Sequence, residues 1–236
     1  MQAAPELGIE RALRHLADDG LLAFPTETSW GLAANARSEA AVAALRAFKG
    51  RDADRPLSIL VADAGALARH APEAGDLARE LAHRYWPGPL TLVVRAASES
   101  KGSRAFAAGV ARADGALGLR CSPHPDANEL AQAAERMGLG PLTATSLNLS
   151  GARAVSSRAD AHTLCAEAGR VAVLAGEECG RAAASTVLDC TTDPPSVLRE
   201  GQLSRSELET AVGQLARSEP ETAVGQLSDP EAARAS

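Results

Sequence analysis

The chain has 236 residues, of which 45% are hydrophobic, a size between one large globular domain and two small ones. Its formal net charge of −6 argues against broad, non-specific nucleic-acid binding, although an acidic protein can carry a local basic cleft. No run of about 18 apolar residues and no signal-peptide pattern over residues 1–20 occurs, so we expect a soluble, cytoplasmic protein. Four cysteines without C-x-x-C spacing predict free thiols in a reducing compartment.

Helices and short strands alternate along the first half of the chain. Apolar residues at helical spacing predict one helix over residues 5–19 and another over 38–48, the second capped by Ser38. Short apolar runs and further helical patterns follow, in the order strand 21–24, strand 57–61, helix 64–70, helix 74–85 and strand 90–94. Residues 25–32 form a block of hydroxyl side chains with no regular apolar period. The Ala-, Ser- and Gly-rich stretch 96–115 predicts a mobile loop.

The second half continues the alternation without strict βαβ regularity. The predicted elements are strand 117–119, helix 126–137, strand 142–145, turn 146–151, helix 158–168, strands 171–174 and 185–190, and strand 196–198. Asp126 and Glu129 are expected to form a capping box at the start of their helix. This interleaving indicates an α/β fold with a mixed sheet.

The C-terminal region holds an internal repeat. Residues 204–215 (SRSELETAVGQL) recur as residues 216–227 (ARSEPETAVGQL). The first copy predicts a terminal helix that begins with a capping box of Ser204 and Glu207. Pro220 interrupts the second copy. We therefore expect one domain over residues 1–215 and a disordered, duplicated tail over residues 216–236.

Polar side chains gather at the ends of the predicted strands. They are hydroxyls, an amide and cations: Thr26, Thr28, Lys49, Arg51, Arg120, Thr143, Thr145, Ser146, Asn148, Ser150, Ser185, Thr186 and Arg199. Ligands of α/β sheets bind where strands end and loops converge. No Walker A, G-x-S-x-G or G-x-G-x-x-G motif is present, and the five histidines are scattered. The set suits an anionic ligand and catalysis by positioning and charge neutralisation, as in nucleotidyl transfer, although each cluster alone also fits an ordinary turn.

Several of these stretches resemble the YrdC-like family, the threonylcarbamoyl-adenylate synthases. The matching stretches, in chain order, are FPTETSWGL (24–32), KGR with the following RPL (49–57), WPGPLTLV (86–93), LRCSPHP (119–125), ATSLNLSG (144–151), STVLD (185–189) and VLREG (197–201). The resemblance implies a single domain with a twisted, mixed parallel and antiparallel sheet, flanking helices and a large, concave, positively charged cavity.

The resemblance also implies a reaction. L-threonine, bicarbonate and ATP would give L-threonylcarbamoyl-AMP and pyrophosphate, with Mg²⁺ bound through the nucleotide and no metal bound by the protein. Separate transfer proteins would pass the threonylcarbamoyl group to tRNA. The resemblance also allows weak, direct binding of tRNA by this chain. Two alternatives remain: a non-catalytic RNA- or tRNA-binding module, disfavoured by the acidic charge and few aromatics, and a carbamoyltransferase-type enzyme, disfavoured by length and cysteine spacing.

Carried over motif by motif, the resemblance implies a nucleotide side and an amino-acid side. The ATP side would comprise Lys49, Arg51, Arg55, Ser146, Asn148 and Arg199. Its catalytic cations would be Lys49 and Arg51, which we expect to face solvent in the cavity. The L-threonine side would comprise Thr26, Thr28, Arg120, Ala144 and Ser185, with Arg120 pairing with the threonine carboxylate.

The chain departs from the family pattern at three positions. They are Trp30, Leu147 and Leu60, which replace a usual Tyr, a usual Ala and, in some relatives, a His.

Overall fold

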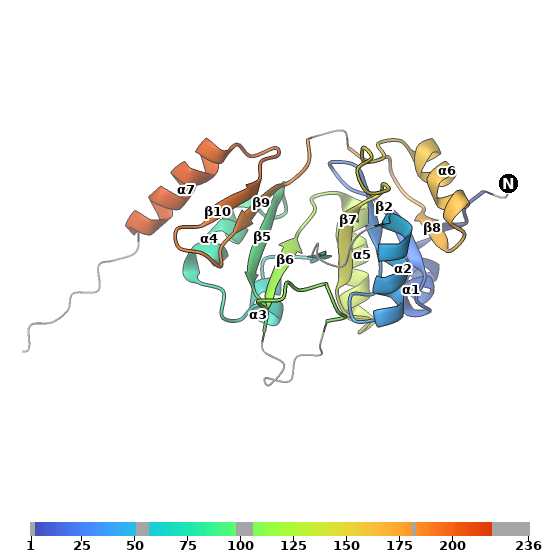
Figure 1. The fold of residues 1–236 in the computed structure, drawn as a ribbon, viewed down its shortest axis with the longest axis horizontal. Helices are drawn as coiled ribbons and strands as arrows, with labels where there is room; N and C mark the ends of the chain where they lie inside the picture. The colour runs from blue at the N-terminus through green and yellow to red at the C-terminus, as the bar shows by residue number, and fades with distance from the viewer. Residues whose placement is uncertain (1–2, 51–56, 98–105, 181–182, 219–236) are drawn as a thin grey trace, which may run out of the picture.

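The computed structural model describes residues 3–50, 57–97, 106–180 and 183–218, and these residues form a twisted sheet flanked by helices (Figure 1). The sheet has ten strands in the order β1-β8-β2-β3-β7-β4-β6-β5-β9-β10. The strands are β1 (Glu6–Leu7), β2 (Leu21–Pro25), β3 (Trp30–Ala33), β4 (Ser58–Leu60), β5 (Leu90–Arg95), β6 (Ala116–Arg120), β7 (Leu142–Ser146), β8 (Val171–Leu174), β9 (Thr186–Asp189) and β10 (Ser196–Arg199). The helices are α1 (Ile9–Ala17), α2 (Glu39–Lys49), α3 (Ala66–His70), α4 (Asp76–Tyr85), α5 (Pro125–Arg136), α6 (Arg158–Ala168) and α7 (Arg205–Ser218).

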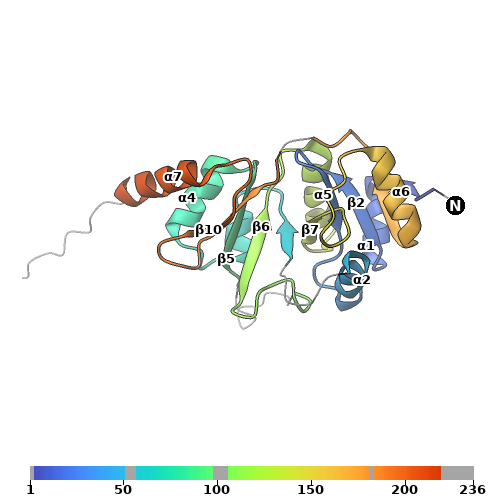
Figure 2. The ribbon, with the colours of Figure 1, turned by 45° about the horizontal axis from the view of Figure 1, so that its top comes forward.

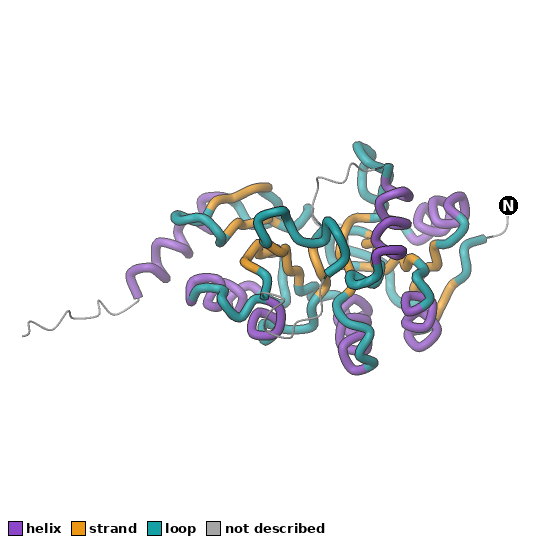
Figure 3. Tube along the Cα trace, turned by 60° about the horizontal axis from the view of Figure 1, so that its bottom comes forward, coloured by secondary structure: helices purple, strands orange, loops and turns teal. Residues whose placement is uncertain are grey.

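Parallel and antiparallel pairs are mixed within the sheet, which confirms the predicted fold class. Strands β1–β8, β2–β8, β4–β6 and β5–β9 pair in parallel. Strands β2–β3, β3–β7, β4–β7, β5–β6 and β9–β10 pair in antiparallel fashion. Helices surround the strands, as the tube view shows (Figure 3).

Two of the predicted helix caps are present in the structure, and a third is not. The Ser38 hydroxyl accepts a hydrogen bond from Ala41 N at the start of α2, as predicted. Ser204 and Glu207 form the expected capping box of α7. The predicted box of Asp126 and Glu129 is wrong: His124 is the N-cap of α5 and makes no side-chain capping bond. The Asp126 carboxylate instead accepts from Glu177 N, at 2.7 Å.

Two strands were not predicted from the sequence. Strand β1 lies within the predicted helix 5–19, because Glu6 and Leu7 pair with β8 and α1 begins only at Ile9. Strand β3 lies within the polar block 25–32 and pairs with β2 as a hairpin. Helix α7 runs to Ser218, and residues 219–236 of the predicted tail lie outside the described residues. The described parts of the predicted loop 96–115 contain no helix or strand.

Helices cover the two faces of the sheet unequally (Figure 2). On one face α1 and α5 pack against each other and over β2, enclosing a core that includes Leu22 and Phe24. The opposite face carries a larger core, to which α2, α4, α6 and α7 contribute buried residues. No helix in the described part of the chain is both long and apolar enough to cross a membrane.

The half of the first face that lies beyond α1 and α5 is where the site forms. Side chains alternate along a strand, so Leu117 and Leu119 of β6 enter the larger core while Gly118 and Arg120 face the other way. A Cβ at position 118 would lie 2.7 Å from the Ser58 hydroxyl on β4, so Ser58 would have to move to make room for a larger residue. Glycine therefore keeps this part of the sheet open above its strands.

Candidate substrate cavity

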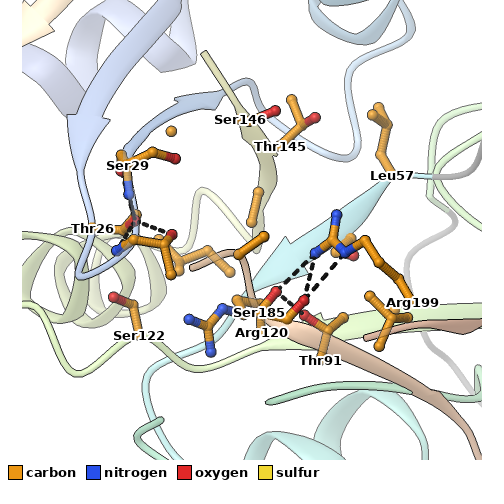
Figure 4. A pocket seen from close by; sticks show the side chains of 18 of the residues that line it. Thr26, Ser29, Leu57, Thr91, Arg120, Ser122, Thr145, Ser146, Ser185 and Arg199 are labelled. Atoms are coloured by element: carbon orange, nitrogen blue, oxygen red, sulfur yellow. Dashed lines mark hydrogen bonds between the residues drawn. The ribbon is translucent and has the colours of Figure 1, made fainter. Parts of the chain in front are cut away.

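A cavity of about 360 Å³ lies on this open half of the sheet (Figure 4). Its walls come from strands that are distant in sequence, including β2, β3, β6, β7, β9 and β10. Its polar side chains are Thr26, Thr28, Ser29, Ser58, Thr91, Arg112, Arg120, Ser122, Thr145, Ser146, Ser185 and Arg199. Hydroxyls and cations therefore dominate the polar lining, as expected for a site that binds anions.

The loop between β2 and β3 is fixed by its own first threonine. The Thr26 hydroxyl donates to Ser29 O at 2.7 Å and accepts from the backbone N–H groups of Thr28 and Ser29 at 3.2 and 3.3 Å. Its oxygen also lies 3.0 Å from the Thr28 hydroxyl. Such side-chain to backbone bonds are the usual means by which Ser and Thr stabilise tight turns. The loop thus presents its hydroxyls to the cavity in one defined arrangement.

Arg120 ends β6 and lies almost entirely inside the protein, with 8% of its surface exposed. Its Nη2 forms an ion pair with Glu27 Oε1, and its Nη1 donates to Gly88 O. Ser122 donates to the other carboxylate oxygen of Glu27 at 2.6 Å. Burial, together with the nearby positive charge of Arg199, lowers the pKa of Arg120 to about 10, so the guanidinium is charged at neutral pH.

Arg199 and Ser185 form a second polar cluster, on the wall contributed by β9 and β10. The Arg199 guanidinium donates to Ser185 O from Nε at 3.2 Å and from Nη2 at 2.8 Å. Nη2 also lies 3.0 Å from the Ser185 hydroxyl, which in turn lies 3.1 Å from the Thr91 hydroxyl. Burial lowers the pKa of Arg199. Figure 4 shows the Arg199 side chain reaching over Ser185 at the edge of the cavity.

Lys49 joins the end of α2 to the turn that follows β7. Its Nζ donates to Ser146 O at 2.6 Å and to Asn148 Oδ1 at 2.8 Å, and its carbonyl accepts from Ser150 N. Asn148 Oδ1 also accepts from the Ser146 hydroxyl at 2.6 Å. The expectation that Lys49 faces solvent is wrong, because only 2% of the residue is exposed. Lys49 therefore holds the turn through these hydrogen bonds. Gly50, which follows it, ends α2 in the left-handed conformation.

Comparison with known proteins identifies the family. The sequence profile of the Sua5/YciO/YrdC family, which carries the description "Telomere recombination", matches residues 14–201. The chain belongs to this family. The threonylcarbamoyl-AMP synthase of Bacillus subtilis is 35% identical over 207 residues, which cover 86% of this chain and 56% of the relative. The threonylcarbamoyl-AMP synthase of Chromohalobacter salexigens is 33% identical, over 77% of this chain and 91% of the relative.

A solved structure of the Sua5/YciO/YrdC family shares the fold. The Pyrococcus abyssi Sua5 structure complexed with L-threonine matches with a TM-score of 0.76 and 32% identity. The match covers 89% of this chain and 60% of the P. abyssi chain. This chain therefore spans little more than half the length of the B. subtilis and P. abyssi relatives.

The predicted site residues fall into three groups by location. All five residues of the predicted threonine side line the one cavity: Thr26, Thr28, Arg120, Ala144 and Ser185. On the predicted ATP side, Ser146 and Arg199 line the cavity, whereas Lys49 and Asn148 contact Ser146 without being part of the lining. Arg51 and Arg55 lie outside the described residues.

The three departures from the family pattern are accommodated within the fold. Trp30 is fully buried and lines the cavity, with the Arg158 guanidinium carbon 5.2 Å from the centroid of its ring. Leu147 is fully buried within the larger core. Leu60 lines the cavity and pairs in register with Arg120.

Sequence reasoning gave no role to several polar residues at this site. Thr91, Arg112 and Ser122 line the cavity, and Glu27 binds Arg120. A signal existed for Glu27, because it is a carboxylate inside a block of hydroxyls, and for Thr91, because it interrupts an apolar strand. Their partners could not be read from spacing, since each contact joins segments that are distant in the chain.

Proposed function

We propose that this domain synthesises L-threonylcarbamoyl-AMP and pyrophosphate from L-threonine, bicarbonate and ATP, the first step of threonylcarbamoyl modification of tRNA. One observation carries the proposal. A single cavity is lined both by hydroxyls and arginines, such as Thr26, Arg120 and Arg199, and by Ser146 of the turn that Lys49 binds. Support also comes from the names of the B. subtilis and C. salexigens relatives and from the threonine bound to P. abyssi Sua5.

On the amino-acid side, Arg120 would pair with the threonine carboxylate. The hydroxyls of Thr26, Thr28 and Ser185 would hold the rest of the molecule, and Ala144 would line the pocket through its backbone. The threonine amine would attack carbon dioxide derived from bicarbonate and lose a proton to give a carbamate. A carbamate oxygen would then attack the α-phosphorus of ATP, forming a P–O bond as the bond to pyrophosphate breaks.

On the nucleotide side, the chemistry requires positive charge, because a carbamate anion must approach a nucleotide of charge about −4. Ser146, Asn148 and Arg199 would contact the nucleotide, together with Arg51 and Arg55 from the neighbouring segment. Lys49 would act from beneath the turn, by fixing the Ser146 carbonyl and the Asn148 amide and by adding its charge. A preorganised donor of this kind is typically worth about 3–4 kcal/mol in the transition state.

Magnesium would enter with the nucleotide. Within the described ranges no group of three or more His, Cys, Asp or Glu side chains is placed to hold a metal ion. The phosphates would then supply most of the ligands, which is common for this ion. The product would pass to separate transfer proteins that modify tRNA, and we place the reaction in the cytoplasm.

The test is threonine-dependent release of pyrophosphate from ATP by the purified chain in bicarbonate buffer. We expect release with L-threonine and a loss of about tenfold or more for Arg120→Ala, whose guanidinium would bind the carboxylate. Arg69→Ala is the matched control, because Arg69 forms exposed ion pairs with Asp63 and Glu135 and does not line the cavity. Pyrophosphate release that continues unchanged without threonine would refute the synthase proposal.

A further inference from the structure

Within the part of the chain that the structure describes, Glu27 is the carboxylate that pairs with the guanidinium proposed to recognise the substrate. It lies in the loop between β2 and β3, and its Oε1 pairs with Arg120 Nη2. The side chains of Glu27 and Arg120 are 18% and 10% exposed, so the pair is largely withdrawn from water. Ser122 holds the second carboxylate oxygen at 2.6 Å. Glu27 therefore links the loop after β2 to the end of β6.

The rest of the protein fixes the opposite arm of the same guanidinium. Arg120 Nη1 donates to Gly88 O, and Leu90 O lies 3.5 Å from the same nitrogen. One arm is thus held by carbonyls of the segment before β5 and the other by a carboxylate. Because a guanidinium is planar, two anchors on different arms set the orientation of the whole group.

The backbone beneath Glu27 is itself held from both sides. Thr26 bonds the loop internally, and Gly180 N donates to Thr26 O at 2.8 Å from the segment that follows β8. That segment approaches so closely that a Cβ on Gly180 would lie 1.9 Å from Glu27 O. Only glycine permits such an approach. The Glu27 side chain consequently starts from a backbone with little freedom to move.

We propose that Glu27 is a positioning residue for amino-acid recognition, holding the Arg120 guanidinium in its binding orientation before the substrate arrives. The inference rests on the proposed function, because it takes Arg120 as the partner of the threonine carboxylate. Orientation fixed in advance removes a conformational cost from binding. Without Glu27, a buried cation would lose its counter-charge and the arginine would turn toward water or another acceptor.

The experiment measures steady-state pyrophosphate release with L-threonine and ATP varied in turn. Glu27→Ala is expected to raise KM for L-threonine by about tenfold or more, while KM for ATP changes by less than about twofold. Glu27→Gln keeps one acceptor oxygen, which can face Arg120 while the amide NH₂ donates to the Ser122 hydroxyl, so it is expected to restore part of the affinity. Ser122→Ala removes the supporting bond to Glu27, together with the acceptor of His124 N, and is expected to raise KM for L-threonine about twofold.

Two controls separate positioning from a general structural effect. Glu135→Ala removes a carboxylate that pairs with an arginine outside the cavity, and it is expected to leave both KM values unchanged. Circular dichroism melting checks that each variant is folded; should Glu27→Ala fail to fold, Glu27→Gln and Ser122→Ala carry the test. An unchanged KM for L-threonine in the folded variants, or equal increases in both KM values, would overturn the inference. A wild-type chain without threonine-dependent release would instead refute the proposed function.

Discussion

Lys49 lies where its motif predicts, at the end of a helix and beside the serine-asparagine turn, yet it faces inward. Its ammonium group is enclosed by Ser146 O and Asn148 Oδ1, and 2% of the residue is exposed. Burial of a lysine is tolerated when its donors are bonded. The same residue therefore stabilises the turn and places a positive charge next to Ser146, which lines the cavity.

Replacing Lys49 with alanine should lower stability as well as activity. Ser146 O and Asn148 Oδ1 would lose their charged donor, and a hydrogen bond to a charged group contributes about 1.5–3 kcal/mol. We expect a lower urea midpoint and pyrophosphate release reduced by about a hundredfold. Lys49→Met, which keeps the aliphatic length without the charge, is the comparison. A Lys49→Ala protein with wild-type stability would show that the enclosed ammonium contributes nothing to the fold.

The residue types at the site could be predicted from the sequence, but their contacts could not. Motif spacing places Thr26, Arg120 and Ser185 at strand ends, and all three line one cavity. Glu27 and Arg120 are distant in sequence and meet only in the folded protein, so no local sequence pattern predicts their ion pair. Burial of Lys49 also depends on the turn that packs over it.

Helices and strands with a strong apolar period were predicted correctly, whereas short elements held by pairing were not. Helix α2 has both a cap and a hydrophobic face, and its predicted range of 38–48 differs from the structure by one residue at each end. Strand β3 has a mixed composition and exists because β2 and β7 pair with it on either side. Strand β1 depends in the same way on β8.

The end of β9 supports a prediction about pH. Asp189 accepts from Thr191 N at 2.9 Å and from the Thr191 hydroxyl at 2.6 Å, and Arg112 pairs with its other oxygen. Burial opposes ionisation, but the bonds from Thr191 and Arg112 outweigh it and hold the pKa of Asp189 below its usual value. A carboxyl whose folded pKa is depressed stabilises the fold above the unfolded pKa and loses that contribution as pH falls through the folded pKa.

The wild-type protein should therefore lose free energy of unfolding on acidification below about pH 4, and Asp189→Asn should lose less. Urea unfolding at several pH values from neutral to about pH 3 measures both. Arg112 also pairs with Asp114, so the double variant with Asp114→Asn shows whether the two carboxylates act together. If the free energy of unfolding falls equally with pH in wild type and Asp189→Asn, Asp189 is not the source of the acid sensitivity.

At the scale of the molecule, the sheet divides into a half covered by helices on both faces and a half with one open face. The open half carries the cavity, and its walls meet only because β7 pairs with both β3 and β4. A mixed sheet was predictable from the irregular alternation of elements. The strand order was not predictable, because the sequence of a strand does not indicate which distant strand pairs with it.

The duplicated C-terminal repeat supports a prediction at the same scale. In the first copy, Ser204 caps α7 and Leu208 is fully buried in the larger core. The second copy has Ala216 and Pro220 at the corresponding positions, so its sequence offers neither a capping serine nor a leucine to bury. We predict that a chain ending at Ser218 keeps its melting temperature and its activity. A drop of several degrees would show that residues 219–236 pack on the domain.

The most direct test of the central claim follows the carbon of bicarbonate. Purified chain is incubated with ATP and ¹⁴C-bicarbonate, with and without L-threonine, and the nucleotides are separated at once. If one cavity joins the three substrates, label appears in a product that also contains AMP, and only when threonine is present. Pyrophosphate release without label in any AMP-containing product, or labelling that does not need threonine, would contradict the account.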